Sequence, residues 1–102
     1  MKLNSQIVPT QVDVVVVGAG PSGMQAALTA AVDGCEVLLV DENPMLGGSL
    51  NYSRLDAKGS MAREVRDLLV HDIEANRNIS CMTNATVNAW FADNWLPIIC
   101  EK

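Results

Sequence analysis

The sequence predicts an α/β fold built on a parallel β-sheet, and three observations support that prediction. Val14 to Val17 form an unbroken apolar run, which is typical of a strand covered on both faces. A second apolar run, Val37 to Val40, lies within residues 36–41, and the segment between the two runs has helical spacing. Because a strand–helix–strand crossover is right-handed, the two strands are expected to lie side by side and parallel.

The first three elements follow from this pattern. The strands are expected at 13–17 and 36–41, with a helix between them at 21–33. Gly34 supplies the expected helix stop, and the many alanines keep the helix thin enough to lie close to the sheet. The apolar face of the helix recurs at i, i+3, i+4 and i+7, as Met24, Ala27, Leu28 and Ala31.

The turn between the first strand and the helix has the pattern G-x-G-x-x-G. In such a turn the first glycine permits a sharp bend, the second lets a pyrophosphate approach the backbone, and the third lets the helix pack on the strand. A proline suits the first helical position, and the free N–H groups of the helix N-terminus would face the phosphates. The pattern predicts a Rossmann-like FAD/NAD(P)-binding domain, with these residues as candidate cofactor ligands: Gly18, Ala19, Gly20, Pro21, Ser22 and Gly23.

A carboxylate closes the second strand at the position where such domains bind ribose. Asp41 follows Gly23 at close to the roughly 20 residues expected for this acid. It would accept hydrogen bonds from the 2′- and 3′-hydroxyls of an adenosine ribose, and Glu42 adds a second negative charge. A 2′-phosphate would be repelled there, so NAD, FAD or ATP is favoured over NADP.

The chain after the second strand is expected to form a loop at 43–50, in which Gly47 and Gly48 allow a ligand to approach the backbone. A second helix is expected to run from Ser60, as its N-cap, to Ala75. The apolar stripe of this helix would consist of Met61, Val65, Leu68, Leu69 and Ile73.

A third strand is expected at 79–87, where apolar and polar residues alternate. Residues 87–91 and 95–100 could form a hairpin around 92–94. The aromatic residues of this region are expected to pack together or beneath protein outside the chain, rather than to stack on a base. We also expect exposed apolar surface at this end, around Trp90, Trp95, Leu96, Ile98 and Ile99.

Composition restricts the possible functions. The chain has 102 residues and a formal net charge of −5, without a basic run, which argues against nucleic-acid and anionic-membrane surfaces. The valine run is far too short to span a bilayer, and the N-terminus lacks the apolar core of a signal peptide. A cytoplasmic location is the default expectation.

The cysteines and the single histidine suggest neither a metal site nor a catalytic residue. Cys35, Cys81 and Cys100 have no C-x-x-C spacing, and we expect the first two to be buried in the core. His71 lies among acidic residues on the second predicted helix and is expected to be a solvated surface side chain.

Two local features carry a resemblance to a known family. One is the sequence DENP at 41–44 followed by GGSL at 47–50, and the other is ATV at 85–87 followed by FADNWL at 91–96. Together with the glycine motif, they resemble the amino-terminal nucleotide domain of large flavin-dependent amine oxidoreductases, of the sarcosine oxidase alpha-subunit type. The resemblance covers roughly residues 11–100.

The resemblance implies a role for each matching residue. The motif glycines would line the phosphates, and Asp41 and Glu42 would bind ribose. Gly47, Gly48 and Ser49 would run beside the dinucleotide, while Thr86 and Val87 would touch the adenine through their backbone. The site of this family would hold NAD, and in some relatives ATP; FAD is the alternative cofactor. Other subunits of a hetero-oligomeric oxidase would carry the flavin that oxidises a secondary amine.

Members of that family are several hundred residues long, so we expect residues 1–102 to be the N-terminal part of a dinucleotide-binding domain, with a sheet that is incomplete at its C-terminal side. Two alternatives stay open. The chain could begin another flavoenzyme, of the pyridine nucleotide–disulfide reductase or monooxygenase type, or it could be a non-catalytic nucleotide-binding module.

Overall fold

The computed structural model describes residues 11–48, 56–94 and 96–100. It contains two sheets, two α-helices and a short 3₁₀ helix. In chain order the elements are β1 (Val14–Val17), α1 (Pro21–Val32), β2 (Val37–Val40), α2 (Asp56–Ala75), β3 (Ile79–Met82), β4 (Ala85–Val87), η2 (Ala92–Asn94) and β5 (Ile98–Cys100).

The first three strands form the parallel sheet that the sequence predicts, in the order β1-β2-β3. Val14 pairs with Val37, and Val37 pairs in turn with Ile79, so the three strands start level with one another. All four side chains of the central strand β2 are buried. The β1–α1–β2 unit is therefore confirmed, and the carboxyl ends of its strands meet at one edge.

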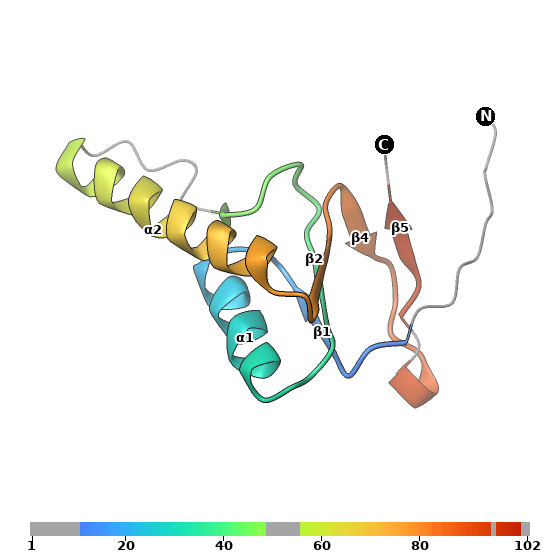
Figure 1. Cartoon of the computed structure of the whole chain (residues 1–102). Helices are drawn as coiled ribbons and strands as arrows, with labels where there is room; N and C mark the ends of the chain where they lie inside the picture. The colour runs from blue at the N-terminus through green and yellow to red at the C-terminus, as the bar shows by residue number, and fades with distance from the viewer. Residues whose placement is uncertain (1–10, 49–55, 95, 101–102) are drawn as a thin grey trace.

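The sheet separates two apolar clusters. Both α-helices lie on one side of it, and the β4–β5 hairpin lies on the other (Figure 1). On the helix side, Met24 and Ile73 pack with Leu39 of β2. On the hairpin side, Leu38 and Ala85 are buried together with Val40. The alternation of β2 between these clusters explains why its apolar run is continuous.

Helix α2 differs from the expectation in where it begins and in how much of its apolar stripe is buried. It begins at Asp56 rather than at an N-cap Ser60, because Ala57 and Lys58 favour helix and the cost of Gly59, about 1 kcal/mol, is tolerated. Its predicted stripe is also only partly covered. Ile73 is buried and Leu69 is half-buried, but the more N-terminal members Met61, Val65 and Leu68 are exposed.

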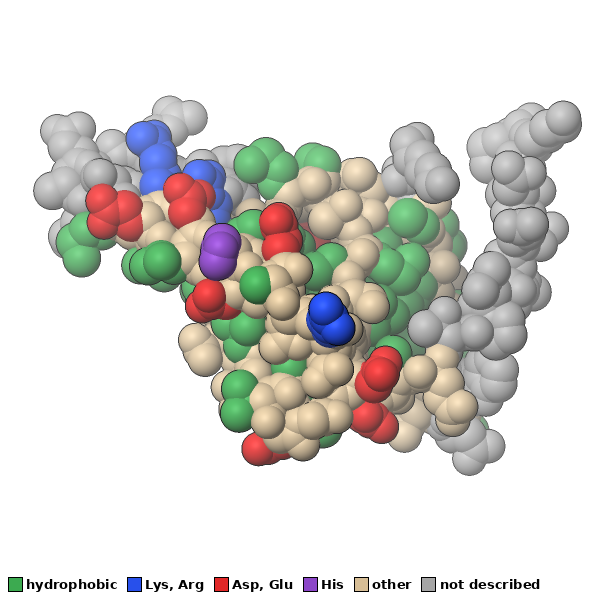
Figure 2. Space-filling model, in the orientation of Figure 1, with side chains coloured by type: hydrophobic (Ala, Val, Ile, Leu, Met, Phe, Trp, Pro, Cys, Tyr) green, Lys and Arg blue, Asp and Glu red, His purple; other side chains and the backbone are tan. Residues whose placement is uncertain are grey.

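The exposed stripe has a simple geometric cause. The N-terminal half of α2 extends past α1, so α1 covers only the C-terminal half (Figure 1). Hydrophobic side chains are visible on that projecting half in the space-filling view (Figure 2). We call Met61, Val65 and Leu68 the outer stripe of α2.

The expected strand at 79–87 is two strands, because the backbone leaves the sheet at Asn84. Asn84 has a φ of 51°, a left-handed conformation that asparagine adopts more readily than most residues. β4 then pairs antiparallel with β5, with Ala85 opposite Cys100 and Val87 opposite Ile98. The hairpin is confirmed, but its first arm is 85–87 rather than 87–91.

The hairpin tip does not form a packed aromatic cluster within the described residues. Trp90 is 76% exposed and Phe91 61% exposed, and the indole N–H of Trp90 donates to Asn94 Oδ1 at 3.2 Å. Ile99 is also exposed, as expected, whereas Leu96 and Ile98 are half-buried. Trp95 lies outside the described residues.

Two further expectations concern single side chains. Cys81 is exposed rather than buried, because its side chain reaches a hollow beside α2, and Cys35 is half-buried. His71 is solvated, with Nδ1 3.7 Å from an Asp72 carboxylate oxygen. Among the described residues, no helix is long and apolar enough to cross a membrane.

Candidate nucleotide-binding site

The glycine motif forms a tight turn at the carboxyl end of β1. Gly18 has a φ of 104°, a conformation that residues with a side chain rarely adopt, and its N–H donates to Val40 O at 2.7 Å. Gly20 is the N-cap of α1 and Pro21 is at the first helical position, as the sequence predicts. The first turn of the helix is formed by a hydrogen bond from Met24 N–H to Gly20 O at 2.9 Å.

The N-terminus of α1 is open to an anion. No side chain caps it among the described residues, and its first turn carries no acidic residue. A Cβ built on Gly20 would meet nothing within 4 Å, so there is open space where a pyrophosphate would approach. Unpartnered N–H groups and the positive end of the helix dipole favour a phosphate at such a place. The exposed Ser22 lies in the same turn.

Gly23 has a different role from Gly20. A Cβ at Gly23 would lie 1.8 Å from the Gly18 carbonyl oxygen and 3.5 Å from a Val16 methyl group. Atoms this close cannot coexist, so the first turn of α1 rests directly on the end of β1. The geometry confirms that the third glycine serves helix–strand packing.

Asp41 is buried at the end of β2, with 6% of its surface exposed. Its Oδ2 accepts the Ala19 N–H at 2.8 Å. Its Oδ1 accepts both the backbone N–H of Asn43 at 2.9 Å and the side-chain amide of Asn43 at 3.2 Å. The carboxylate therefore holds the backbone of the glycine turn in place through Ala19 N–H, in addition to any contact with a ribose. The neighbouring Glu42 is exposed.

The loop after β2 folds back onto the glycine turn. Gly47 N donates to Ala19 O at 2.8 Å, and a Cβ on Gly48 would lie 2.8 Å from Gly20 Cα. Gly47 and Gly48 both have positive φ values. The close approach that these glycines permit is thus first of all to the glycine turn itself. Ser49 lies outside the described residues.

A third segment completes the edge. Asn84 N donates to Asn43 O at 3.1 Å, and Ala85 N donates to Asp41 O at 3.0 Å. These bonds hold the start of β4 beside the end of β2. Of the two residues expected near an adenine, Thr86 is exposed and Val87 is half-buried. The structure thus brings the glycine turn, the post-β2 loop and β4 together.

Sequence reasoning missed Asn43, although a signal for it was present. An aspartate can accept the N–H of the residue two positions further along, and asparagine favours such turns. The D-x-N spacing of Asp41 and Asn43 could therefore have been recognised as a structured turn rather than a plain loop.

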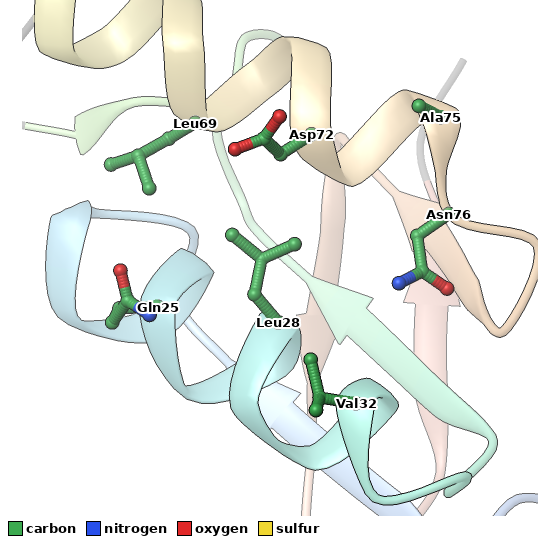
Figure 3. Close-up of a pocket in the computed structure, with 7 residues that line it drawn as sticks. All are labelled: Gln25, Leu28, Val32, Leu69, Asp72, Ala75 and Asn76. Carbon is green, nitrogen blue, oxygen red and sulfur yellow. The ribbon is translucent and has the colours of Figure 1, made fainter.

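Two hollows lie outside this edge. One, of about 470 Å³, lies between α1 and α2, with Leu28 and Leu69 facing each other across it (Figure 3). The other, of about 620 Å³, lies between α2 and the post-β2 loop and includes Cys81. Desolvation raises the pKa of the Cys81 thiol, with a smaller contribution from the Glu74 carboxylate. Within the described part of the chain, no three potential metal ligands gather.

Comparison with known proteins identifies the family. Residues 13–88 match the model of the FAD dependent oxidoreductase family. The chain belongs to that family.

Among curated proteins, this FAD-dependent oxidoreductase chain is similar to alpha subunits of sarcosine oxidase. It is 54% identical to that of Corynebacterium sp. (strain P-1) over 88% of its own length, and 36% identical to that of Rhizobium meliloti over 80%. It is also 43% identical to an NADH oxidase of Thermoanaerobacter brockii over 60% of its length. The chain spans less than a tenth of each of these relatives, 8% to 9% of their length.

The chain is also similar to parts of solved structures of oxidoreductases. A 6-hydroxypseudooxynicotine amine oxidase from Pseudomonas geniculata matches 70% of the chain at 31% identity with a TM-score of 0.63, and 11% of that enzyme is covered. L-proline dehydrogenase from P. horikoshii matches 95% of the chain with a TM-score of 0.72, covering 22% of that protein. At 22% identity the second likeness supports the fold alone.

Proposed function

We propose that this chain binds the ADP part of a dinucleotide at the edge formed by the glycine turn and Asp41. The observation that carries the proposal is the open space at Gly20, directly at an uncapped helix N-terminus. Backbone N–H groups at such a place bind phosphate without a dedicated cation. Asp41 lies beside it, held by Ala19 N–H, as a ribose acceptor would need to be.

Each site residue has a place in this proposal. Gly18, Gly20 and the first turn of α1 line the pyrophosphate, while the backbone groups of Ala19 hold the turn in shape. Asp41 accepts from the ribose, and the exposed Glu42 adds negative charge beside it. Backbone atoms of Gly47 and Gly48 run beside the ligand, and those of Thr86 and Val87 contact the adenine.

The family membership supports FAD, whose flavin accepts two electrons from the substrate. The finer alternative is NAD, which the likeness to sarcosine oxidase alpha subunits suggests. Both ligands carry a free adenosine diol and a pyrophosphate, so the residues described here fit either. A 2′-phosphate does not fit, because two carboxylates adjoin the ribose position.

We further propose that the full protein is a subunit of a multi-subunit oxidase acting on a secondary amine such as sarcosine. The similarity to several sarcosine oxidase alpha subunits supports this assignment. A second candidate is the FAD-binding start of a pyridine nucleotide–dependent flavoenzyme, which the likeness to an NADH oxidase favours.

Ligand titration tests the binding proposal. Calorimetric titration of the full 102-residue chain with ADP, FAD, NAD and NADP should show binding of the first three and far weaker binding of NADP. Gln25→Ala, on the exposed face of α1, is a matched control that should bind normally. Equal affinity for NAD and NADP would contradict the ribose assignment.

Turnover of the assembled oxidase tests the proposal that the full protein is a subunit of a secondary-amine oxidase. With sarcosine or a related secondary amine, the complex should reduce its own flavin without consuming NAD. Stoichiometric formation of NADH during turnover would favour the NADH oxidase–like candidate instead.

A further inference from the structure

The Asp41 carboxylate has few acceptor positions left for a ligand. A carboxylate offers about four lone-pair positions, two on each oxygen. Asn43 occupies both positions of Oδ1 through its backbone N–H and its side-chain amide. Ala19 N–H occupies one position of Oδ2. One acceptor position, on Oδ2 beside the glycine turn, is therefore free.

We propose that Asn43 is a positioning residue that makes Asp41 bind a single hydroxyl of the adenosine ribose rather than both. This inference rests on the proposed nucleotide site and specifies how that site recognises its ligand. Recognition of both ribose hydroxyls would need a second free acceptor position on Asp41. The only other candidate position, on Oδ1, already accepts the side-chain amide of Asn43.

Asn43 is itself held in place from a second side. Its carbonyl oxygen accepts Asn84 N–H at 3.1 Å, so the residue connects the post-β2 loop to the start of β4. Ala85 N–H, bonded to Asp41 O at 3.0 Å, holds the same junction. The backbone of Asn43 is thus anchored independently of its side chain. Substitution of the side chain should leave this backbone connection intact.

The same geometry couples Asn43 to the glycine turn. By fixing Oδ1, Asn43 fixes the orientation of the carboxylate, and Oδ2 then stays on Ala19 N–H. Gly18 N–H belongs to the same turn but bonds to Val40 O, which does not depend on Asp41. The amides of Ala19 and Gly18 therefore report separately on the carboxylate and on the strand.

Hydrogen exchange of the ligand-free chain tests the positioning role. Asn43→Ala should speed exchange of the Ala19 amide about tenfold and leave the Gly18 amide within about twofold of wild type, because only the first depends on the carboxylate. Asn88→Ala, at another exposed asparagine, is the matched control and should change neither amide. Unchanged exchange at Ala19 in Asn43→Ala would overturn the positioning role.

Titration with ADP, 2′-deoxy-ADP and 3′-deoxy-ADP tests the hydroxyl selection. In the wild-type chain one deoxy analogue should bind within about twofold of ADP and the other about tenfold more weakly, since a hydrogen bond to a charged group is lost in only one of them. In Asn43→Ala both analogues should bind more weakly than ADP, because Oδ1 has regained a free acceptor.

Each outcome decides something. Equal losses for the two analogues in the wild type, or no loss for either, would overturn the selection of one hydroxyl. An unchanged pattern in Asn43→Ala would show that Asn43 is not its cause. If the wild type binds no ADP, the proposed function and the hydroxyl selection fail together, and the exchange measurement alone decides the positioning role.

Discussion

The glycine turn at the carboxyl edge of the parallel sheet and the outer stripe of α2 differ in how fully other residues of the described chain contact them. At the sheet edge, the backbone groups of the glycine turn bond to Val40, Asp41 and Gly47 at 2.7 to 2.8 Å. On the outer stripe, Met61 and Leu68 are 64% and 67% exposed. The glycine turn is held by contacts within the chain, whereas the outer stripe has apolar side chains without a covering partner among the described residues.

This difference reflects two kinds of sequence signal. A glycine at a tight backbone contact is required by atoms that lie a few residues away, so the motif specifies its own structure. A helical apolar stripe only indicates that one face is suited to burial. Whether that face is covered depends on the length and placement of the neighbouring helix.

Gly23→Val should have the largest effect and would break the sheet edge itself. Its Cβ would collide with the Gly18 carbonyl, and the helix must move away from β1. The free energy of unfolding should fall by about 3 kcal/mol, at the upper end of what overpacking costs. Urea denaturation followed by circular dichroism measures it. A loss below about 1 kcal/mol would contradict the backbone contact.

Gly20→Val should separate binding from folding. Open space surrounds this position, so unfolding should change by no more than about 1 kcal/mol, whereas the branched side chain fills the pyrophosphate position. Calorimetric titration with ADP should show loss of binding. Full affinity in this variant would show that the phosphates lie elsewhere.

Asp41→Ala should affect both properties moderately. Nucleotide affinity should fall at least about tenfold, because the hydrogen bond from the ribose to a charged acceptor is lost. Stability should fall by about 1–3 kcal/mol, since Ala19 N–H loses its acceptor in a buried place. Titration and urea denaturation of the same preparation give the two values. Normal stability would mean that the turn does not need this carboxylate.

The parts of the fold that the sequence predicts well are those fixed by local chemistry. The β1–α1–β2 unit, Pro21 at the first helical position and the packing role of Gly23 follow from spacing and sterics. The break at Asn84 was missed because the alternating pattern continues through it, while the backbone reverses there by adopting a positive φ. Exposure of Cys81 depends on what lies across from β3, which alternation alone does not specify.

Polar substitution in the outer stripe tests whether the exposed half of α2 contributes less to stability than its covered half. Met61→Gln with Leu68→Gln should leave the free energy of unfolding within about 0.5 kcal/mol per site, because both side chains are already exposed. Fluorescence of a hydrophobic dye bound to the chain should decrease. Ile73→Ala, on the covered half of α2, is the contrast and should cost about 2–5 kcal/mol. Similar losses in the two variants would contradict the difference between the halves.

The smallest effect is expected at Cys81, in the hollow between α2 and the post-β2 loop. Desolvation and then the Glu74 carboxylate raise the pKa of this thiol, and the thiolate is the reactive form. At pH 8, alkylation of Cys81 by iodoacetamide should therefore be slower in the folded chain than in the urea-unfolded chain. Glu74→Gln removes the smaller of the two causes, so it should lower the pKa of the thiol and speed the reaction. Glu64→Gln, on the exposed surface of the same helix, should not. Peptide-resolved mass spectrometry measures Cys81 separately from Cys35 and Cys100, and an unchanged rate in Glu74→Gln would show that this carboxylate does not act on the thiol.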